Sequence, residues 1–194
     1  MLSRRVLLAS FLAGPAVAGV GLIGGRLAQA EAILADDGLY KQPWFLESFL
    51  ELADDLAGAS EKKKRFAIMW ELRGCPYCKE THLVNFAKPE IENFVKDRFE
   101  ILQLNIIGSR EVTDFDGEKL SEKRMAEKYG VRFTPTFQFF PDGVTGLAQK
   151  KPREREVARA QGYLEPRHFL ALFRFVSERA YEKGSLRDYL KSNG

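Results

Sequence analysis

Residues 66–78 read FAIMWELRGCPYC, and this stretch decides the fold. It opens with five apolar residues in an unbroken run, which is typical of a strand buried on both faces. A proline follows Cys75, and proline is tolerated in the first turn of a helix because its missing N–H has no helical partner there. The pattern therefore predicts a buried strand, a turn, and a helix that begins at Cys75 and carries Cys78.

The rest of the chain continues this alternation of strands and helices. Upstream, apolar residues at spacings of three and four predict an amphipathic helix from Pro43 to Leu56. Downstream, the same signals predict a helix at 91–96, a strand at 99–107, a polar loop at 108–120, a helix between Ser121 and Gly130, strands at 133–140 and 157–163, and helices at 166–176 and 185–190. This order indicates an α/β fold in which a central mixed sheet is flanked by helices, with extra N- and C-terminal helices.

Length and charge indicate a single domain that does not bind nucleic acid. The chain has 194 residues, which suits a single domain, and we place that domain at residues 31–194. Arg4, Arg5 and Arg26 are three of the 30 basic residues and precede every acidic residue, so 27 basic residues remain to balance 27 acidic ones. Because the domain carries no net charge, we expect no nucleic-acid partner.

Residues 1–30 have the three parts of an export signal peptide: a positive start, an apolar stretch and a small-x-small cleavage site. Arg4 and Arg5 precede 20 uncharged residues, and Ala28-Gln29-Ala30 forms the cleavage site. The arginine pair resembles that of bacterial twin-arginine signals. We therefore expect a periplasmic protein. The alternative is an uncleaved N-terminal membrane anchor, for which the apolar stretch is just long enough.

Cys75 and Cys78 are the only cysteines of the chain. A disulfide can persist outside the cytosol, but closing so short a loop contributes only about 2 kcal/mol, so we expect the pair to react rather than to brace the fold. A helix N-terminus stabilises a thiolate, as does Arg73, whereas Glu71 and Glu80 oppose it. Cys75 is thus the candidate nucleophile, and Cys78, one turn inward, is the candidate resolving thiol.

Other chemistry stays open for the same residues. Cys75, Cys78 and His82 have the spacing C-x2-C-x3-H, which favours a metal site or a metallochaperone where a fourth ligand is available. An inert local disulfide is a further alternative. We expect His82 to be a packed or surface residue of the helix, and we expect no cofactor besides the disulfide.

The acidic segment around Gly117 also has two interpretations. Asp114, Asp116 and Glu118 weakly resemble a calcium loop, but their spacing does not fit an EF-hand, so we interpret them as a polar turn. A redox-inactive docking module is the alternative from outside redox chemistry. Such a module grips a partner with the loop at 108–120 and a hairpin tip expected at 150–155.

The combination of motifs resembles the thioredoxin superfamily. A strand ends in C-x-x-C, a strand and a helix intervene, and Thr134-Pro135 opens a strand with Asp142-Gly143 at its end. The resemblance implies a thioredoxin-like fold with Cys75 as the attacking thiolate and Cys78 as the resolving thiol. It also implies that Pro135 is a cis-proline beside them and that the backbone of Thr134 binds a partner chain.

Three segments resemble, more narrowly, the periplasmic thioredoxins encoded with bacterial sulfur-oxidation (Sox) enzymes, the SoxW type. They are GSREVTDFDG at 108–117, FTPTFQFF at 133–140 and GYL at 162–164. This resemblance implies a protein that keeps a cysteine of a periplasmic partner in its working redox state. We expect it to reduce that cysteine and to draw electrons from a membrane donor.

The chain departs from thioredoxin close to the cysteines. Gly74 stands where thioredoxin has a tryptophan, and Met69 stands where it has a buried aspartate that takes the proton of the resolving thiol. We expect Glu71 or water to serve instead. Pro76 and Tyr77, which support the site between the cysteines, are the glutaredoxin dipeptide. A glutathione-dependent reaction, or disulfide isomerisation or oxidation, is therefore an alternative activity.

Overall fold

Strands and helices alternate along residues 32–193, the part of the chain that the computed structural model describes. The strands are β1 (Ile33–Leu34), β2 (Tyr40–Lys41), β3 (Arg65–Glu71), β4 (Phe99–Asn105), β5 (Glu111–Thr113), β6 (Lys119–Ser121), β7 (Thr136–Phe139) and β8 (Ala158–Gln161). The α-helices are α1 (Leu52–Glu61), α2 (Pro76–Glu80), α3 (Pro89–Arg98), α4 (Glu122–Lys128), α5 (Pro166–Ser177) and α6 (Leu186–Asn193). The shorter helical turns are the π-helical η1 (Thr81–Asn85) and the 3₁₀ turns η2 (Pro152–Glu154) and η3 (Ala180–Glu182).

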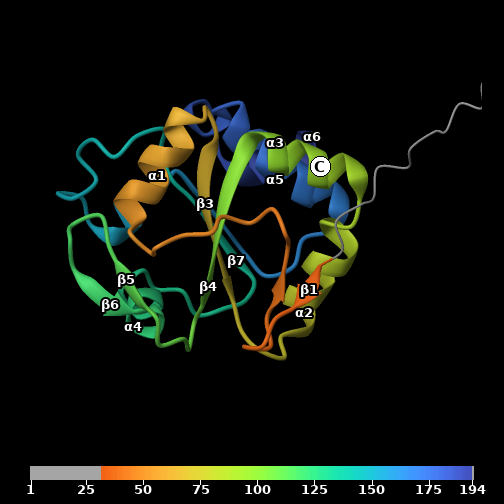
Figure 1. Cartoon of the computed structure of the whole chain (residues 1–194). Coiled ribbons are helices and arrows are strands. Elements are labelled where there is room, and N and C mark those ends of the chain that lie inside the picture. The colour runs from red at the N-terminus through yellow and green to blue at the C-terminus, as the bar shows by residue number, and fades with distance from the viewer. Residues whose placement is uncertain (1–31, 194) are drawn as a thin grey trace, which may run out of the picture.

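The central sheet has four strands in the order β4–β3–β7–β8 (Figure 1). β3 is parallel to β4 and antiparallel to β7, which is in turn antiparallel to β8. The mixed α/β fold expected from the sequence is thereby confirmed, including the extra helices at both ends.

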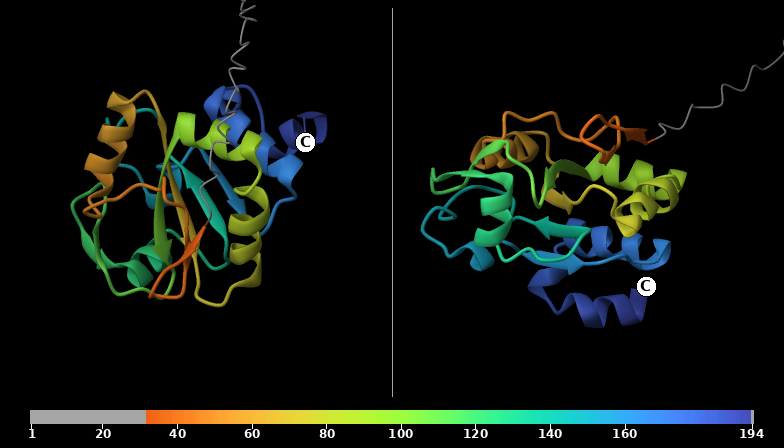
Figure 2. Two further views of the ribbon diagram at one scale, coloured as in Figure 1. Left: turned by 45° about the vertical axis from the view of Figure 1, so that its right-hand side comes forward. Right: turned by 90° about the horizontal axis from the view of Figure 1, so that it is seen from below.

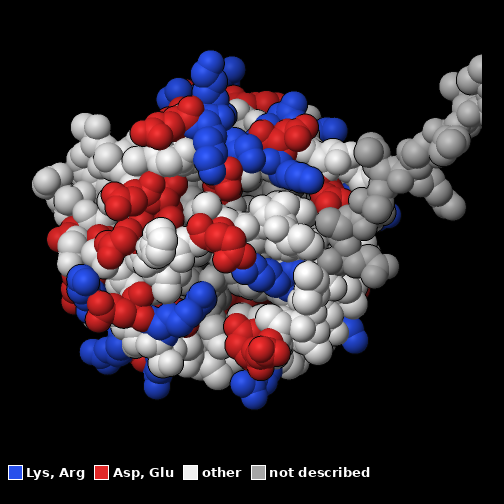
Figure 3. Space-filling model, viewed as in Figure 1, with Lys and Arg blue, Asp and Glu red and all other residues white. Residues whose placement is uncertain are grey.

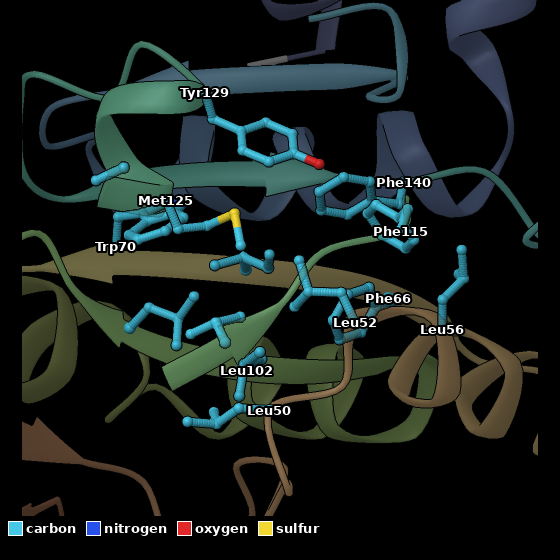
Figure 4. Packing of buried hydrophobic residues seen from close by; sticks show 14 of the residues in the cluster. Leu50, Leu52, Leu56, Phe66, Trp70, Leu102, Phe115, Met125, Tyr129 and Phe140 are labelled. Carbon is cyan, nitrogen blue, oxygen red and sulfur yellow. The ribbon is translucent and has the colours of Figure 1, made fainter. Parts of the chain in front are cut away.

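Helices cover both faces of this sheet (Figure 2). Successive side chains of β3 point to opposite faces, so Phe66, Ile68 and Trp70 pack in one cluster with α1 and α4. Ala67 and Met69 pack in the other cluster with α3 and α5. Figure 4 shows the first cluster from close by. This burial on both faces is why β3 has an unbroken apolar sequence.

Charged side chains of both signs are interspersed on the face of the molecule shown in Figure 3. The most basic segment, which follows α1, is partly neutralised by nearby acids. Lys62 and Lys64 lie 3.3 and 3.2 Å from the carboxylate of Glu100, and Arg65 forms an ion pair with Asp142.

The expected signal peptide at 1–30 lies outside the described residues. Within residues 32–193, the structure has no helix that is both long enough and apolar enough to cross a membrane.

The helix expected from Pro43 to Leu56 is wrong over most of its length. Its first nine residues form turns and extended chain, and α1 begins only at Leu52. Backbone groups in this segment have partners elsewhere in the fold: the N–H of Leu46, for example, donates to the carbonyl of Ile101 in edge strand β4 at 2.9 Å. Such tertiary hydrogen bonds replace helical ones, and the apolar spacing cannot show them.

The loop expected at 108–120 contains a small hairpin in which β5 and β6 pair antiparallel. The segment 150–155 is not a hairpin tip, because it contains η2 and ends at Arg155, which is only 3% exposed. The guanidinium of Arg155 lies 2.7 Å from the carboxylates of both Asp114 and Asp116. Charged residues that the docking hypothesis assigns to a partner are therefore paired within the chain.

Asp55, in the first turn of α1, leads to a pH-dependent prediction. Burial raises the pKa of Asp55 from 3.8 to about 6, although a 2.6 Å hydrogen bond from Ser48 Oγ opposes this shift. A carboxyl with a higher pKa in the folded state costs stability as the pH rises through that pKa. The full shift corresponds to about 3 kcal/mol, and partial exposure reduces it. We expect Asp55→Asn to raise the free energy of unfolding by about 1 kcal/mol at about pH 7.5 and by little at about pH 4.

Urea unfolding at the two pH values measures this difference. Asp97→Asn, an exposed position on α3, is the matched control and should change the free energy of unfolding by less than about 0.5 kcal/mol. An Asp55→Asn gain of equal size at both pH values would contradict the prediction.

Candidate functional site

The turn between β3 and α2 places Cys75 at the start of the helix. Gly74 in this turn has φ 76°, a left-handed conformation that favours glycine, so a tryptophan at this position would be strained. Cys75 is the N-cap of α2, and its Sγ accepts a hydrogen bond from the backbone N–H of Cys78 at 3.1 Å. Free N–H groups and the positive end of the helix dipole therefore surround the sulfur of Cys75.

Cys75 and Cys78 form a disulfide, with their Cα atoms 5.3 Å apart. Cys75 is partly exposed, whereas Cys78 is only 4% exposed. A thiol or disulfide that arrives from solvent therefore meets Cys75 first. Thiol–disulfide exchange uses this kind of asymmetry between an attacking and a resolving cysteine.

The loop before β7 packs against the cysteines, although it comes 59 residues after Cys75. The Thr134–Pro135 peptide bond is cis, and the carbonyl oxygen of Thr134 lies 3.6 Å from Cys75 Sγ. The carbonyl of Pro135 accepts a hydrogen bond from the N–H of Gly162 at 2.8 Å, which ties the loop to the end of β8. The fold thus brings Thr134 and Pro135 to Cys75, as a common site requires.

Aromatic side chains stand on α2, beside the cis-proline loop and after β8. Pro76 begins the helix, and Tyr77 after it is 55% exposed and stacks on Tyr163 with ring centroids 6.1 Å apart. Phe133 is 62% exposed. Neither Phe133 nor Tyr163 was predicted from the sequence as a site residue. For Phe133, its place directly before Thr134 was the available signal.

A cavity of about 450 Å³ opens beside the disulfide. Its walls come from both cysteines, the end of β3, the turn after it and the N-terminal hairpin β1–β2, which lies beside α2 in Figure 1. Glu71, Arg73 and Lys79 are the charged residues of its lining. This hairpin could not be predicted from the sequence, because two strands of two residues each carry almost no periodicity.

A buried acid and a buried histidine meet at this end of β3. Glu71 and His82 are each only 1% exposed, and Glu71 Oε1 lies 3.0 Å from His82 Nε2. The amide nitrogen of Gln103 donates to Glu71 Oε2, and the amide nitrogen of Gln42 lies 3.3 Å from His82 Nδ1. Met69, by contrast, packs in the apolar cluster under α3 and α5 and offers no group that accepts a proton.

His82 is therefore a packed residue, but its neighbours are polar on both sides of the ring. Both ring nitrogens already face a hydrogen-bonding partner, so neither is directed at a metal shared with the cysteines. Over residues 32–193, the structure places no three His, Cys, Asp or Glu side chains as a metal-binding group.

Comparison with known families agrees with this geometry. The model of a thioredoxin-like domain family matches residues 52–177. The chain belongs to this thioredoxin-like family. Thioredoxin-like proteins are generally thiol:disulfide oxidoreductases that use a redox-active disulfide rather than a cofactor, and the pair Cys75–Cys78 supplies such a disulfide here.

A solved structure shows the same fold, and a second is more distant. A thioredoxin-fold protein from Helicobacter pylori is 21% identical with a TM-score of 0.52, and the match covers 68% of this chain and 84% of that one. The solution structure of a thioredoxin from Thermus thermophilus is 22% identical with a TM-score of 0.49, covering 68% of this chain and 88% of that one. The search of curated protein sequences gave no match. At 21% identity, the likeness to the Helicobacter pylori protein supports the fold of this thioredoxin-like chain and no further property.

Proposed function

We propose that the protein is an exported thiol:disulfide oxidoreductase that reduces disulfides of protein substrates. The observation that carries this proposal is the position of Cys75, partly exposed at the N-terminus of α2 and 3.6 Å from the carbonyl of Thr134. A sulfur in this place is accessible, and the helix N-terminus stabilises its thiolate form.

The reaction proceeds in two exchanges. The Cys75 thiolate attacks one sulfur of a substrate disulfide, so that a mixed disulfide forms and the other substrate sulfur leaves as a thiolate. The Cys78 thiolate then attacks Cys75, which forms the Cys75–Cys78 disulfide and releases the second substrate thiolate. The substrate gains two electrons, and the protein dithiol loses them.

The residues around the disulfide suit an extended peptide as substrate. The backbone of Thr134 beside cis-Pro135 offers hydrogen-bonding groups next to Cys75. Tyr77 on α2 and Phe133 directly before Thr134 offer exposed apolar surface. Pro76 fixes the start of α2 and so the direction of Tyr77.

The resemblance to SoxW-type thioredoxins supports a more specific role. In this role, a twin-arginine signal in residues 1–30 delivers the protein to the periplasm. There the protein keeps a cysteine of a sulfur-oxidation partner reduced. Each cycle leaves the protein as the disulfide, so a membrane donor must return two electrons before the next cycle.

The reduction potential of the Cys75–Cys78 couple tests the proposed direction. We expect a value near about −270 mV, measured by equilibrating the purified protein with defined thiol buffers. A value near about −120 mV would identify an oxidant that introduces disulfides, and a pair that does not cycle would overturn the redox proposal. Faster cycling with glutathione than with a protein disulfide would favour the glutaredoxin-like alternative suggested by Pro76 and Tyr77.

A further inference from the structure

We infer that the buried Glu71–His82 pair accepts the proton that Cys78 must lose before it can resolve the mixed disulfide. The inference rests on the proposed function, because only thiol–disulfide exchange requires a Cys78 thiolate. Cys78 is 4% exposed, so bulk water has little access to its thiol. The position at which thioredoxin has a buried acid holds Met69, and the proton needs another acceptor.

The pair lies where such an acceptor is needed. Glu71 ends β3 and lines the same cavity as Cys75 and Cys78. His82 follows Cys78 by four residues in the continuous helix α2–η1, so both side chains lie on one side of that helix. A cavity of about 450 Å³ has room for the water that carries a proton from Cys78 to Glu71.

The charge of the buried region favours the transfer. A carboxylate beside a neutral imidazole carries one negative charge, among the rings of Phe45 and Phe86 that lie 5.6 and 5.8 Å from the His82 ring. When the pair takes the proton it becomes neutral overall, and Cys78 becomes the thiolate. The region therefore holds one negative charge before and after the step, so the transfer avoids the cost of burying a second charge.

Gln42 holds the histidine through the ring nitrogen that does not face Glu71. Its amide nitrogen faces His82 Nδ1, which suits a neutral ring that accepts there, while its own Oε1 is buried without a hydrogen-bond partner. The same amide nitrogen donates to the backbone carbonyl of His82 at 3.3 Å, so Gln42 holds both the ring and the backbone of the histidine. Gln103 holds the other end of the pair, because its amide nitrogen donates both to Glu71 Oε2 and to the carbonyl of Tyr40.

The proton transfer and the resolving attack need no other reactant. The S–H proton of Cys78 passes to the pair, the Cys78 thiolate attacks the Cys75 sulfur, and the bond from Cys75 to the substrate sulfur breaks. The other titratable or charged groups on this cavity are Tyr40, Arg73 and Lys79. Arg73 and Lys79 are exposed and donate only, so they favour the thiolate but do not remove its proton.

A single-turnover reaction with the aromatic disulfide dithiobis(nitrobenzoate) separates the two cysteines. Attack by Cys75 releases one coloured thiolate, and the later attack by Cys78 on the mixed disulfide releases a second. We expect Glu71→Gln to slow the second release at least about tenfold at about pH 6, with the rate approaching that of the wild type near pH 9, where thiols ionise unaided. We expect His82→Gln to slow the same phase with the same dependence on pH. A purely structural role would slow it equally at every pH.

Glu122→Gln is the matched control. Glu122 is a buried glutamate, 2% exposed and 2.6 Å from Arg110, and it does not line the cavity beside the cysteines. Its variant should leave the second phase unchanged at each pH. A second phase that is unchanged or faster in Glu71→Gln overturns the inference; if that variant does not fold, an unchanged second phase in His82→Gln overturns it. Loss of both phases in the wild type would instead contradict the proposed function.

Discussion

Cys75→Ser is expected to abolish the reduction of protein disulfides, with a loss of at least about a thousandfold. Serine has nearly the same shape but no thiolate at neutral pH, and Cys78 is too buried to meet the substrate in its place. The measurement is the rate at which the reduced protein opens an interchain disulfide of a model substrate, with a thiol buffer alone as the background.

Cys78→Ser is the matched variant, because it removes the other sulfur at the same site. It should retain the first attack and accumulate a mixed disulfide between Cys75 and the substrate, visible by mass as a one-to-one adduct. If the Cys75→Ser variant formed the adduct equally well, Cys78 would also attack the substrate, and the assignment of the two roles would be wrong. If cells with Cys75→Ser had an unchanged phenotype, the redox and metallochaperone hypotheses would be excluded, and only the docking module would remain.

Local sequence signals were sufficient for the centre of the site. The apolar run of β3 shows burial on both faces, Pro76 fixes the start of α2, and the thioredoxin resemblance joins the C-x-x-C motif to Thr134-Pro135. The first two signals depend on residues adjacent in the chain, because strand burial and helix initiation are decided locally. The third joins segments 59 residues apart and comes from the resemblance alone. The structure adds the distance of 3.6 Å between Cys75 Sγ and the Thr134 carbonyl, which the sequence could not supply.

Prediction from the sequence failed where the residues in contact lie far apart in the chain. The apolar spacing after Pro43 suits a helix, yet the N–H of Leu46 donates to the edge of the sheet 55 residues later. Glu71 could be named as a candidate base because it precedes the cysteines, but its contact with His82 depends on how β3 and η1 pack. Pairings of this kind are set by the tertiary fold, and composition and periodicity do not record them.

The internal ion pairs of Arg155 lead to the second large effect, on stability. Nη1 of Arg155 lies 2.7 Å from Asp114 and Nη2 lies 2.7 Å from Asp116, so one side chain joins the segment after β7 to the β5–β6 hairpin. Removing one partner of a buried ion pair costs about 3–5 kcal/mol where the remaining charge has no other partner. Here Lys128 still pairs with both carboxylates, so the low end of this range applies. We expect Arg155→Leu to lower the free energy of unfolding by this amount near neutral pH, measured by urea unfolding.

Acid should reduce this difference between Arg155→Leu and the wild type. Burial alone raises the pKa of Asp116, but hydrogen bonds from Arg155 and Lys128 outweigh it and hold the pKa below its ordinary value of 3.8. A carboxyl with a lower pKa in the folded state stabilises the fold above the unfolded-state pKa and loses that contribution as the pH falls through the folded-state value. The gap between the two proteins is therefore full at neutral pH and narrows below about pH 4.

Two variants separate the geometry of Arg155 from its charge. Arg155→Lys keeps the positive charge but cannot reach both carboxylates with a planar fork, so its loss of stability should be intermediate. Arg153→Leu removes a neighbouring arginine that is 61% exposed and pairs with Glu156 at 3.4 Å, and it should cost less than about 1 kcal/mol. If Arg153→Leu and Arg155→Leu were equally destabilising, the buried ion pairs would not hold the hairpin, and its charged residues would again be available to a partner.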